Sequence, residues 1–259
     1  MLSPELPYVA WILVAVFVAL IAVLAVRASR KSGKEYRQFK RYRSTVRRQK
    51  MFRKWLRESF LVFGGLSVGI LVLVWQFVPL LLAEVNSFEW VVFLRARFVD
   101  AGALAWVIVL VVAVVFLVLP IVLLFFVSNE EGEDLPSIGD IQAMLPRNRA
   151  EVRLGALLSL NAGLVEELLF RLAVPALLYG AFGSAIFALV TSALLFGGLH
   201  AYQGVTGILG TTLIGALLLV LYVATGSILV PIVVHALIDL RSFVAIPLIV
   251  LRVGSKSGR

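Results

Sequence analysis

The chain has 259 residues, of which 61% are hydrophobic, and it contains no cysteine. This apolar share lies well above the roughly 45–50% of a soluble domain, so an ordinary soluble protein is excluded. Disulfide frameworks, thiolate zinc sites and cysteine nucleophiles are excluded as well. The predicted fold class is an all-α, polytopic integral membrane helical bundle, with about seven or eight transmembrane helices of the length that a bilayer requires.

The first apolar run covers residues 7–26 and has membrane-spanning length. Because no positive charge precedes it, we interpret it as a retained anchor and not as a cleaved signal peptide. A basic segment at residues 27–57 follows directly and holds 14 of the 24 lysines and arginines of a chain whose net charge is +9. By the positive-inside rule this segment is cytoplasmic, which places the N-terminus outside the plasma membrane.

Apolar and aromatic residues recur at helical intervals within the basic segment. One interpretation is an amphipathic helix that lies on anionic lipid. The other is a solvated cytoplasmic loop that only fixes the membrane topology. Nothing beyond charge supports nucleic-acid binding, and we expect none. The recurring residues are Tyr36, Phe39, Val46, Phe52, Trp55 and Leu56.

Two further spans are expected at residues 60–83 and 101–127. The first contains Gly65-Leu-Ser-Val-Gly69, which matches both the G-x-S-x-G nucleophile elbow and the G-x-x-x-G packing motif. A nucleophile elbow needs a sharp strand-to-helix turn, whereas the context here is a long apolar helix. Close helix packing is therefore the better explanation. Pro120 is expected to kink the second span.

A polar stretch at residues 128–153 divides the chain into two membrane modules. It is rich in Glu and Asp, and its few apolar residues are spaced for a short interfacial helical turn. We therefore expect an N-terminal membrane segment with three spans at residues 1–127, a connector at 128–153 and a C-terminal membrane domain at 154–253.

The C-terminal domain is predicted to contain four or five shorter helices separated by glycine-bearing breaks. Pro175 is expected to kink the first of them. The last two are short for a full span, so they are either tilted or parts of one broken unit. The predicted ranges are 154–179, 183–201, 205–225, 227–240 and 243–253.

Six ionisable residues lie within apolar helices of this domain, where each costs about 2.5–3.5 kcal/mol on insertion scales. Such groups normally face one another inside a bundle, so we expect them to converge on one cavity from three helices. They include the only two histidines of the chain. The six are Glu166, Glu167, Arg171, His200, His235 and Asp239.

The spacing of these residues suggests how they divide. Glu167 and Arg171 are four apart with the acid first, which predicts an ion pair. Glu166 points about 100° away around the helix and is the carboxylate that we expect to act as a general base. His235 and Asp239, also four apart, share a helix face. Carboxylates beside histidines either activate water directly or hold a metal that does so, and both arrangements are hydrolytic.

Three other classes of intramembrane protease fit the sequence less well. The H-E-x-x-H zinc motif is absent, no hydroxyl nucleophile stands beside a histidine, and Asp239 is the only convincing intramembrane aspartate. These observations argue against the zinc, serine and aspartyl types.

Three motifs, in this order on successive apolar helices, resemble those of the CPBP family: Glu166-Glu167-x-x-x-Arg171, Phe196-x-x-x-His200 and His235-x-x-x-Asp239. The family comprises CAAX-prenyl-endopeptidase and bacteriocin-processing intramembrane proteases and is also called ABI. The resemblance covers about residues 150–250 and implies an intramembrane endopeptidase that acts on a peptide or protein segment at the membrane. Asp239 stands where the eukaryotic CAAX enzymes have asparagine, and the family pattern accepts either.

The resemblance also implies roles for single residues. Glu166 and His200 would activate a water for attack on a peptide carbonyl, and His235 with Asp239 would help to stabilise the oxyanion. Because an ionised Asp239 cannot donate a hydrogen bond, it would act through His235. The family has been described both as glutamate-dependent and as metal-dependent; in the second case the same four residues would hold one divalent ion, such as zinc. The implied supporting residues are Glu167, Arg171 and Phe196.

The competing interpretation is a non-proteolytic membrane protein, either a scaffold or a proton-coupled transport or binding protein that uses the same buried cluster. Against transport, the sequence shows no paired-half symmetry and no second set of broken helices. The complete set of motifs favours activity, so we expect an endopeptidase.

Overall fold

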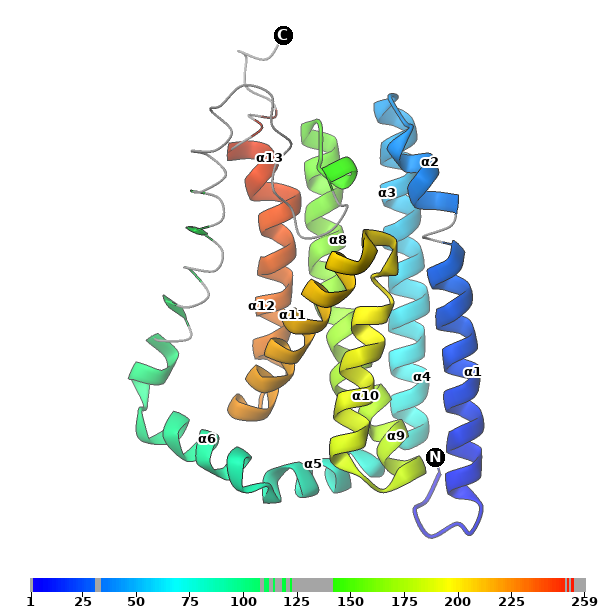
Figure 1. Ribbon diagram of the computed structural model, residues 1–259, viewed down its shortest axis with the longest axis vertical. Helices are drawn as coiled ribbons and strands as arrows, with labels where there is room; N and C mark the ends of the chain where they lie inside the picture. Colours follow the sequence, from blue (N-terminus) through cyan, green and yellow to red (C-terminus); the bar gives the residue numbers. More distant parts are fainter. Residues whose placement is uncertain are drawn as a thin grey trace.

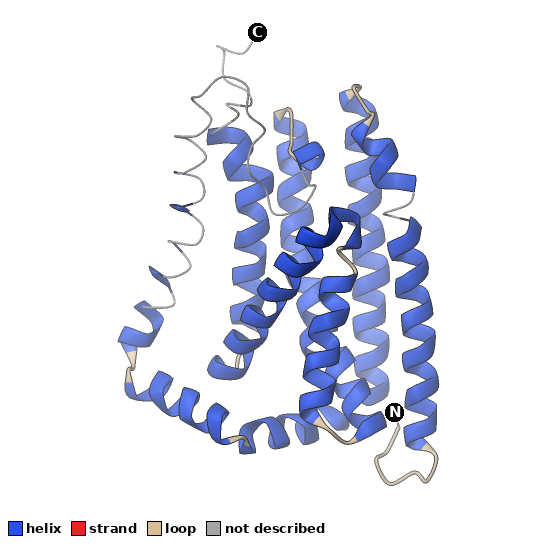
Figure 2. Ribbon diagram, in the orientation of Figure 1, coloured by secondary structure: helices blue, strands red, loops and turns tan. Residues whose placement is uncertain are grey.

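The computed structural model describes residues 2–30, 34–107, 142–249, 251 and 253, together with positions 110, 111, 114, 118, 119 and 122. Within these residues the elements are helices, and no strand is present (Figure 2). Figure 1 shows most of the long helices running side by side, with α5 (Phe77–Ser87) and α6 (Glu89–Asp100) lying across one end of the bundle. The predicted all-α membrane bundle is confirmed.

The number of membrane spans is smaller than expected in the part of the chain that the structure describes. Four helical segments are long and apolar enough to cross a membrane, or five if α5 and α6, which are bent by 83° relative to each other, form one broken span. The predicted seven or eight are therefore not confirmed. The expected span at 101–127, with Pro120, lies largely outside the described residues. The four segments are Val9–Ser29, Thr45–Val74, Ala201–Thr225 and Leu229–Ile249.

The first predicted span is present as α1 (Val9–Arg30), but the second has different ends. Its helix runs through α3 (Thr45–Ser59), the π-helical turn η2 (Phe60–Gly64) and α4 (Gly65–Val74) without a break. The prediction of 60–83 was therefore wrong at both ends. The helix begins inside the basic segment because the apolar side of α3 is buried by the protein.

Four of the six recurring apolar residues of the basic segment pack inward, whereas Val46 is exposed. Tyr36 and Phe39, on α2 (Tyr36–Lys40), and Phe52 and Trp55, on α3, are buried in one cluster with Met144. The rings of Phe39 and Phe52 meet edge to face with their centroids 5.5 Å apart. The segment is therefore a folded part of the bundle and not a solvated loop, and these apolar side chains contact protein where a lipid-bound helix would present them to lipid.

A long helical run carries the first motif. It consists of α8 (Arg149–Glu167), the π-helical turn η4 (Leu168–Ala173) and α9 (Val174–Phe182). Pro175 was expected to kink this helix, and the structure has the wide turn η4 directly before it. Since proline lacks an N–H and its ring opposes the carbonyl four residues earlier, a widened turn accommodates it within a continuous helix. This turn begins at the residue after Glu167.

Arg48 joins α3 to the start of α8. It is fully buried, and its Nε donates to Oε2 of Glu151 over 3.1 Å. Its terminal nitrogens donate to the carbonyl oxygens of Ala143 and Leu145 over 2.9 and 3.0 Å. Glu151 is also fully buried, and its backbone N–H donates to the side chain of the N-cap residue Asn148. This network fixes a charged pair where both partners are removed from water.

The remaining helices complete the second half of the bundle. They are α10 (Ala185–Gly198), η5 (Ala201–Gln203), α11 (Gly204–Thr225), α12 (Leu229–Leu240), η6 (Arg241–Ala245) and α13 (Ile246–Ile249). The predicted helices at 227–240 and 243–253 join into one candidate span, Leu229–Ile249. Helix α8 packs against α3 and α12, and α10 packs against α9 and α11.

Small residues allow helices to approach closely at two places. A Cβ on Gly163 would lie 2.8 Å from the carbonyl oxygen of Ile232, so α8 and α12 meet there. Within the motif Gly65–Gly69, Ser67 is fully buried, and its hydroxyl lies 2.7 Å from the carbonyl oxygen of Phe63 and 3.2 Å from that of Val165 on α8. The predicted close packing is therefore made by Ser67, whereas a Cβ on Gly65 or Gly69 would meet nothing within 4 Å among the described residues.

Candidate active site

Four of the predicted polar residues line one cavity of about 160 Å³. Glu166 comes from α8, His200 from the turn after α10, and His235 and Asp239 from α12. The close approach of α8 and α12 brings the first and the third motif together. Glu166, His200 and Asp239 are half-buried, whereas only 5% of the surface of His235 is exposed.

The two adjacent glutamates face different surroundings. Glu166 lines the cavity, whereas Glu167 is fully buried between helices. This division follows from the turn of about 100° between neighbouring residues of a helix. The carboxylate in the cavity is accessible to a water or a substrate, while its neighbour is enclosed by protein groups.

Glu167 holds a cation and a histidine at the same time. Its Oε2 lies 3.1 Å from Nε of Arg171, which confirms the predicted ion pair. Its Oε1 lies 2.8 Å from Nδ1 of His235. Because an ionised carboxylate only accepts hydrogen bonds, Nδ1 of His235 is protonated and its N–H donates a hydrogen bond to Glu167. This contact fixes the orientation and tautomer of the ring and presents Nε2 as its other polar atom.

Arg171 is enclosed by contacts that hold it in place. A terminal nitrogen donates to the carbonyl oxygen of Gly215 over 3.1 Å, and the guanidinium carbon lies 5.3 Å from the centre of the Phe196 ring. The same ring lies 5.1 Å from the ring of His200 and 5.8 Å from that of His235. Phe196 therefore packs against both histidines, as a supporting residue would.

His200 lies in a turn, and the expectation that both histidines lie within helices was wrong for this one. Helix α10 ends at Gly198, and two consecutive glycines weaken its last turn. Nδ1 of His200 lies 2.9 Å from the carbonyl oxygen of Phe196, which can only accept. Nδ1 is therefore the donor, and Nε2 carries the lone pair of the neutral ring. That nitrogen is the one able to take a proton from water.

The contact between Glu167 and His235 was missed by sequence reasoning, which paired His235 only with Asp239 on the same helix face. Asp239 does line the cavity on the same helix as His235. The acceptor at Nδ1, however, is Glu167, which lies 68 residues earlier in the chain. No local spacing predicts a contact over such a separation.

Residues of the N-terminal half also line the cavity. Arg27, Trp55, Ser59 and Phe63 take part, although none belongs to the three motifs. Ser59 accepts a hydrogen bond from the side-chain amide of Asn161 on α8 over 2.9 Å. The spacing of aromatic residues in the basic segment was the only sequence signal for this part of the cavity lining. It did not indicate which helices the segment packs against.

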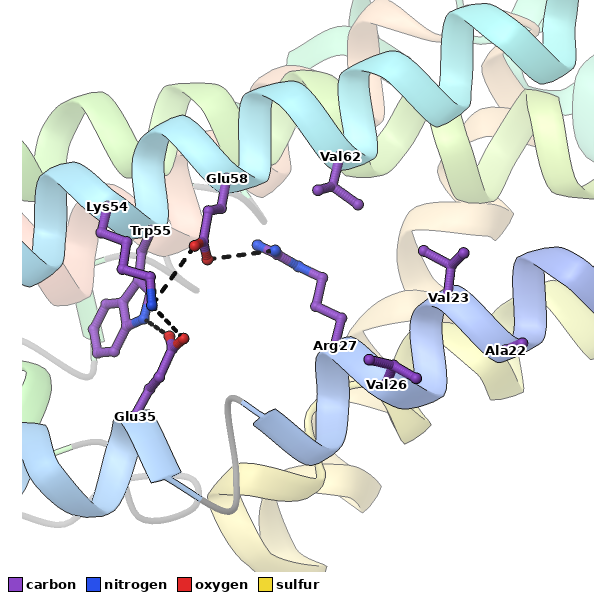
Figure 3. Close-up of a pocket in the computed structure, with 9 residues that line it drawn as sticks. All are labelled: Ala22, Val23, Val26, Arg27, Glu35, Lys54, Trp55, Glu58 and Val62. Atoms are coloured by element: carbon purple, nitrogen blue, oxygen red, sulfur yellow. Dashed lines mark hydrogen bonds and ion pairs between the residues drawn. The ribbon is translucent and has the colours of Figure 1, made fainter.

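A second hollow, of about 520 Å³, adjoins this wall between α1 and the α3–η2 helix (Figure 3). Arg27 and Trp55 line both cavities. Glu35 accepts hydrogen bonds from Lys54 over 2.5 Å and from the Trp55 indole over 2.8 Å. Burial opposes ionisation of Glu35, but these two donors and the nearby cations outweigh it and hold its pKa below the usual value.

The described residues include no group of three or more His, Asp or Glu side chains placed to hold one ion. Nδ1 of His235 faces Glu167 and Nδ1 of His200 faces a backbone carbonyl, which leaves Nε2 as the second nitrogen of each ring. Metal-binding histidines make the same kind of Nδ1 contact. The zinc site implied for Glu166, His200, His235 and Asp239 therefore stays a prediction, and no step below uses a metal.

A carboxylate and two oriented histidines surround a small cavity inside an all-α membrane bundle, and hydrolytic enzymes use groups of these types. Residues 148–241 match the family described as Rce1-like, type II CAAX prenyl endopeptidase Rce1-like. No curated protein and no solved structure matches the chain. The matched segment contains all three motifs, and this match supports membership of residues 148–241 in the CPBP family of intramembrane proteases. The family supports CAAX-type protease activity in an integral membrane protein.

Proposed function

We propose that this protein is an intramembrane endopeptidase that hydrolyses a peptide bond of a membrane-associated peptide or protein through a water activated by Glu166 and His200. The observation that carries the proposal is the single cavity lined by Glu166, His200 and His235, in which each histidine is oriented through its Nδ1. Two proton acceptors and a histidine that can become a cationic donor, around one small space, are what peptide hydrolysis needs.

In the proposed reaction a water lies between the Glu166 carboxylate and Nε2 of His200. Glu166 takes a proton from this water while the oxygen of the water attacks the peptide carbonyl carbon. The carbonyl π bond breaks and leaves a tetrahedral oxyanion. Glu166 then returns the proton to the departing nitrogen as the C–N bond breaks. The products are a carboxylic acid and an amine, and the enzyme regains its starting state.

His235 would stabilise the oxyanion. When its ring is protonated, Nε2–H donates to the developing negative charge while Nδ1–H remains bonded to Glu167. The buried carboxylate balances the positive charge of the ring. Asp239 would add negative charge on the other side of the ring without donating to the oxyanion itself.

The Glu167→Gln variant tests this role of Glu167. The amide still reaches Nδ1 of His235, but it no longer balances a positive ring, and Arg171 loses its ion-pair partner. We expect kcat to fall on the order of 10²–10⁴-fold with little change in KM, as when an orienting carboxylate is replaced in a triad. The variant also unfolds at lower temperature, so kinetics are measured where it is still folded.

The kinetics of Glu167→Gln distinguish a role of Glu167 in orienting His235 from a role in stabilising the bundle. If Glu167 only stabilises the bundle, the folded variant would turn over at the parent rate. A rate that recovers in Glu167→Asp, which keeps the charge, would support the positioning role.

We further propose that the protein lies in the plasma membrane with its N-terminus outside and residues 27–57 at the cytoplasmic side, where exposed basic side chains meet anionic headgroups. Because Arg27 and Trp55 of this region line the cavity, the peptide bond would be cut near the cytoplasmic interface. The partner is a peptide or protein substrate at the membrane, and no nucleic acid is involved.

The proposal is tested by reconstituting the full chain in liposomes with a mixture of membrane proteins and identifying new peptide termini by mass spectrometry. We expect termini that form with the parent protein and with Glu89→Gln, which changes an exposed acid on α6, but not with Glu166→Gln. The same termini with Glu166→Gln would contradict the mechanism. A folded parent protein that produces none would favour a scaffold or a proton-coupled binding protein.

A further inference from the structure

The hollow between α1 and the α3–η2 helix has a lining that the proposed reaction does not use. Its volume is about 520 Å³, whereas the cavity that holds Glu166 and His200 has about 160 Å³. The two cavities share Arg27 and Trp55 but none of the residues that act on the water or the peptide bond. The hollow therefore has room for a ligand of its own.

The lining of this hollow is charged at one end and apolar at the other (Figure 3). Val23 and Val26 on the apolar side are 45% and 50% exposed, so the protein itself leaves much of their surface uncovered. A ligand that suits both ends combines a charged group with an apolar chain, as a membrane lipid does. The charged residues are Arg27, Glu35, Lys54 and Glu58, and the apolar residues are Ala22, Val23, Val26 and Val62.

Helix α1 places the charged end of the hollow near a membrane interface. The helix axis from Val9, where α1 begins, to Arg27 is roughly 27 Å long. This length is close to the thickness of about 30 Å of the hydrocarbon core of a bilayer. We therefore expect Arg27 to lie at the depth of the lipid headgroups, and Val23 to lie one turn deeper, beside the acyl chains.

Glu58 and Arg27 keep capacity for further hydrogen bonds. Glu35 is occupied, because it accepts from both Lys54 and Trp55. Oε2 of Glu58 lies 3.6 Å from a terminal nitrogen of Arg27, and its Oε1 lies 3.6 Å from Nζ of Lys54. Both distances are longer than a hydrogen bond. The side chain of Glu58 is 31% exposed and that of Arg27 is 19% exposed, so a ligand can reach both.

The balance of charges in the hollow favours a zwitterionic headgroup over an anionic one. The cations Arg27 and Lys54 are matched by the carboxylates of Glu35 and Glu58, so these side chains together carry no net formal charge. An ammonium can donate to Glu58 while a phosphate accepts from Arg27. We propose that the hollow binds phosphatidylethanolamine in this way, with the acyl chains against its apolar end. This site does not depend on the protease proposal, because no residue of the reaction takes part in it.

Native mass spectrometry of the full chain, released from detergent micelles, measures lipid binding without requiring cleavage. The probes are dioleoyl phosphatidylethanolamine, its N,N-dimethyl derivative and dioleoyl phosphatidylcholine, each added separately. They share the acyl chains and the phosphate and differ in the number of N–H donors on the ammonium. A difference between them in the Kd of the first bound lipid therefore reports on the contact of the ammonium.

We expect phosphatidylethanolamine to bind about tenfold more tightly than phosphatidylcholine, with the dimethyl lipid between them, as charge-assisted hydrogen bonds predict. Most of this preference should disappear in Glu58→Gln, because a neutral amide attracts an ammonium less. Glu89→Gln, which changes an exposed acid of α6, should leave the preference unchanged. Arg27→Gln should weaken the binding of all three lipids, since they share the phosphate, whereas Arg57→Gln, at an exposed arginine of α3, should not.

Equal affinities for the three lipids in the parent protein would overturn the inference, and this comparison needs no variant. A preference for phosphatidylethanolamine that Glu58→Gln leaves intact would place the ammonium elsewhere and overturn it too. Unchanged affinities for all three lipids in Arg27→Gln would show that the phosphate is not bound in the hollow, which also contradicts the proposed site.

Discussion

Glu166→Gln is expected to reduce kcat/KM by about 10²–10⁴-fold, the range that general acid–base groups contribute. The amide cannot take a proton from water, although its size and its position in the cavity are nearly unchanged. His200→Ala should cause a loss of similar size. Because both side chains act on the same water, the double variant should be little slower than either single one. Turnover of a defined peptide in proteoliposomes measures all three.

The folded state should tolerate these changes. Glu166 lines a cavity and is half-buried, so its replacement leaves no enclosed charge behind. The thermal unfolding midpoint in detergent is therefore expected to stay close to that of the parent. Near-parent turnover by Glu166→Gln would exclude this carboxylate as the base, and fully multiplicative losses in the double variant would argue that the two residues act in separate steps.

Arg48→Met is expected to lower the free energy of unfolding by about 3–5 kcal/mol, as is typical when one partner of a buried ion pair is removed. The variant leaves the Glu151 carboxylate enclosed without its cation, and the carbonyls of Ala143 and Leu145 without their donors. Equilibrium unfolding in mixed detergent measures the change. Arg47→Met, one residue earlier and exposed, is the matched control and should change little.

A double variant distinguishes two causes of lost stability: the buried, unpaired charge of Glu151 and the loss of the Arg48–Glu151 ion pair itself. Arg48→Met combined with Glu151→Leu removes both charges and should regain much of the stability lost in Arg48→Met. If Arg48→Met behaved like Arg47→Met, the buried network between α3 and α8 would not contribute to the stability of the bundle.

The membrane class and the residues of the cavity could be predicted because their signals are local. A long apolar run predicts α1, and the spacing of four between Glu167 and Arg171 predicts their ion pair, which is present at 3.1 Å. Proline chemistry predicts a disturbed helix at Pro175, but it does not predict the π-helical turn that precedes it.

Contacts between residues far apart in the sequence could not be predicted from such local signals. The basic segment was interpreted as a lipid-bound amphipathic helix or a solvated loop. Its burial in the protein could not be predicted, because Glu151, which pairs with the buried Arg48, is 103 residues away. The acceptor of His235 is 68 residues away. The place of His200 in a turn depends on where α10 ends, and helix ends are weakly specified by an apolar sequence that continues past them.

The mechanism rests on water activated by side chains of the protein without a metal. The measurement that tests this most directly is the cleavage rate of the purified protein in proteoliposomes after extensive chelation, with its metal content determined on the same sample. We predict an unchanged rate at far less than one metal ion per chain, together with loss of cleavage in Glu166→Gln under the same conditions. A rate that disappears on chelation and returns when zinc is restored in a one-to-one ratio would contradict the mechanism.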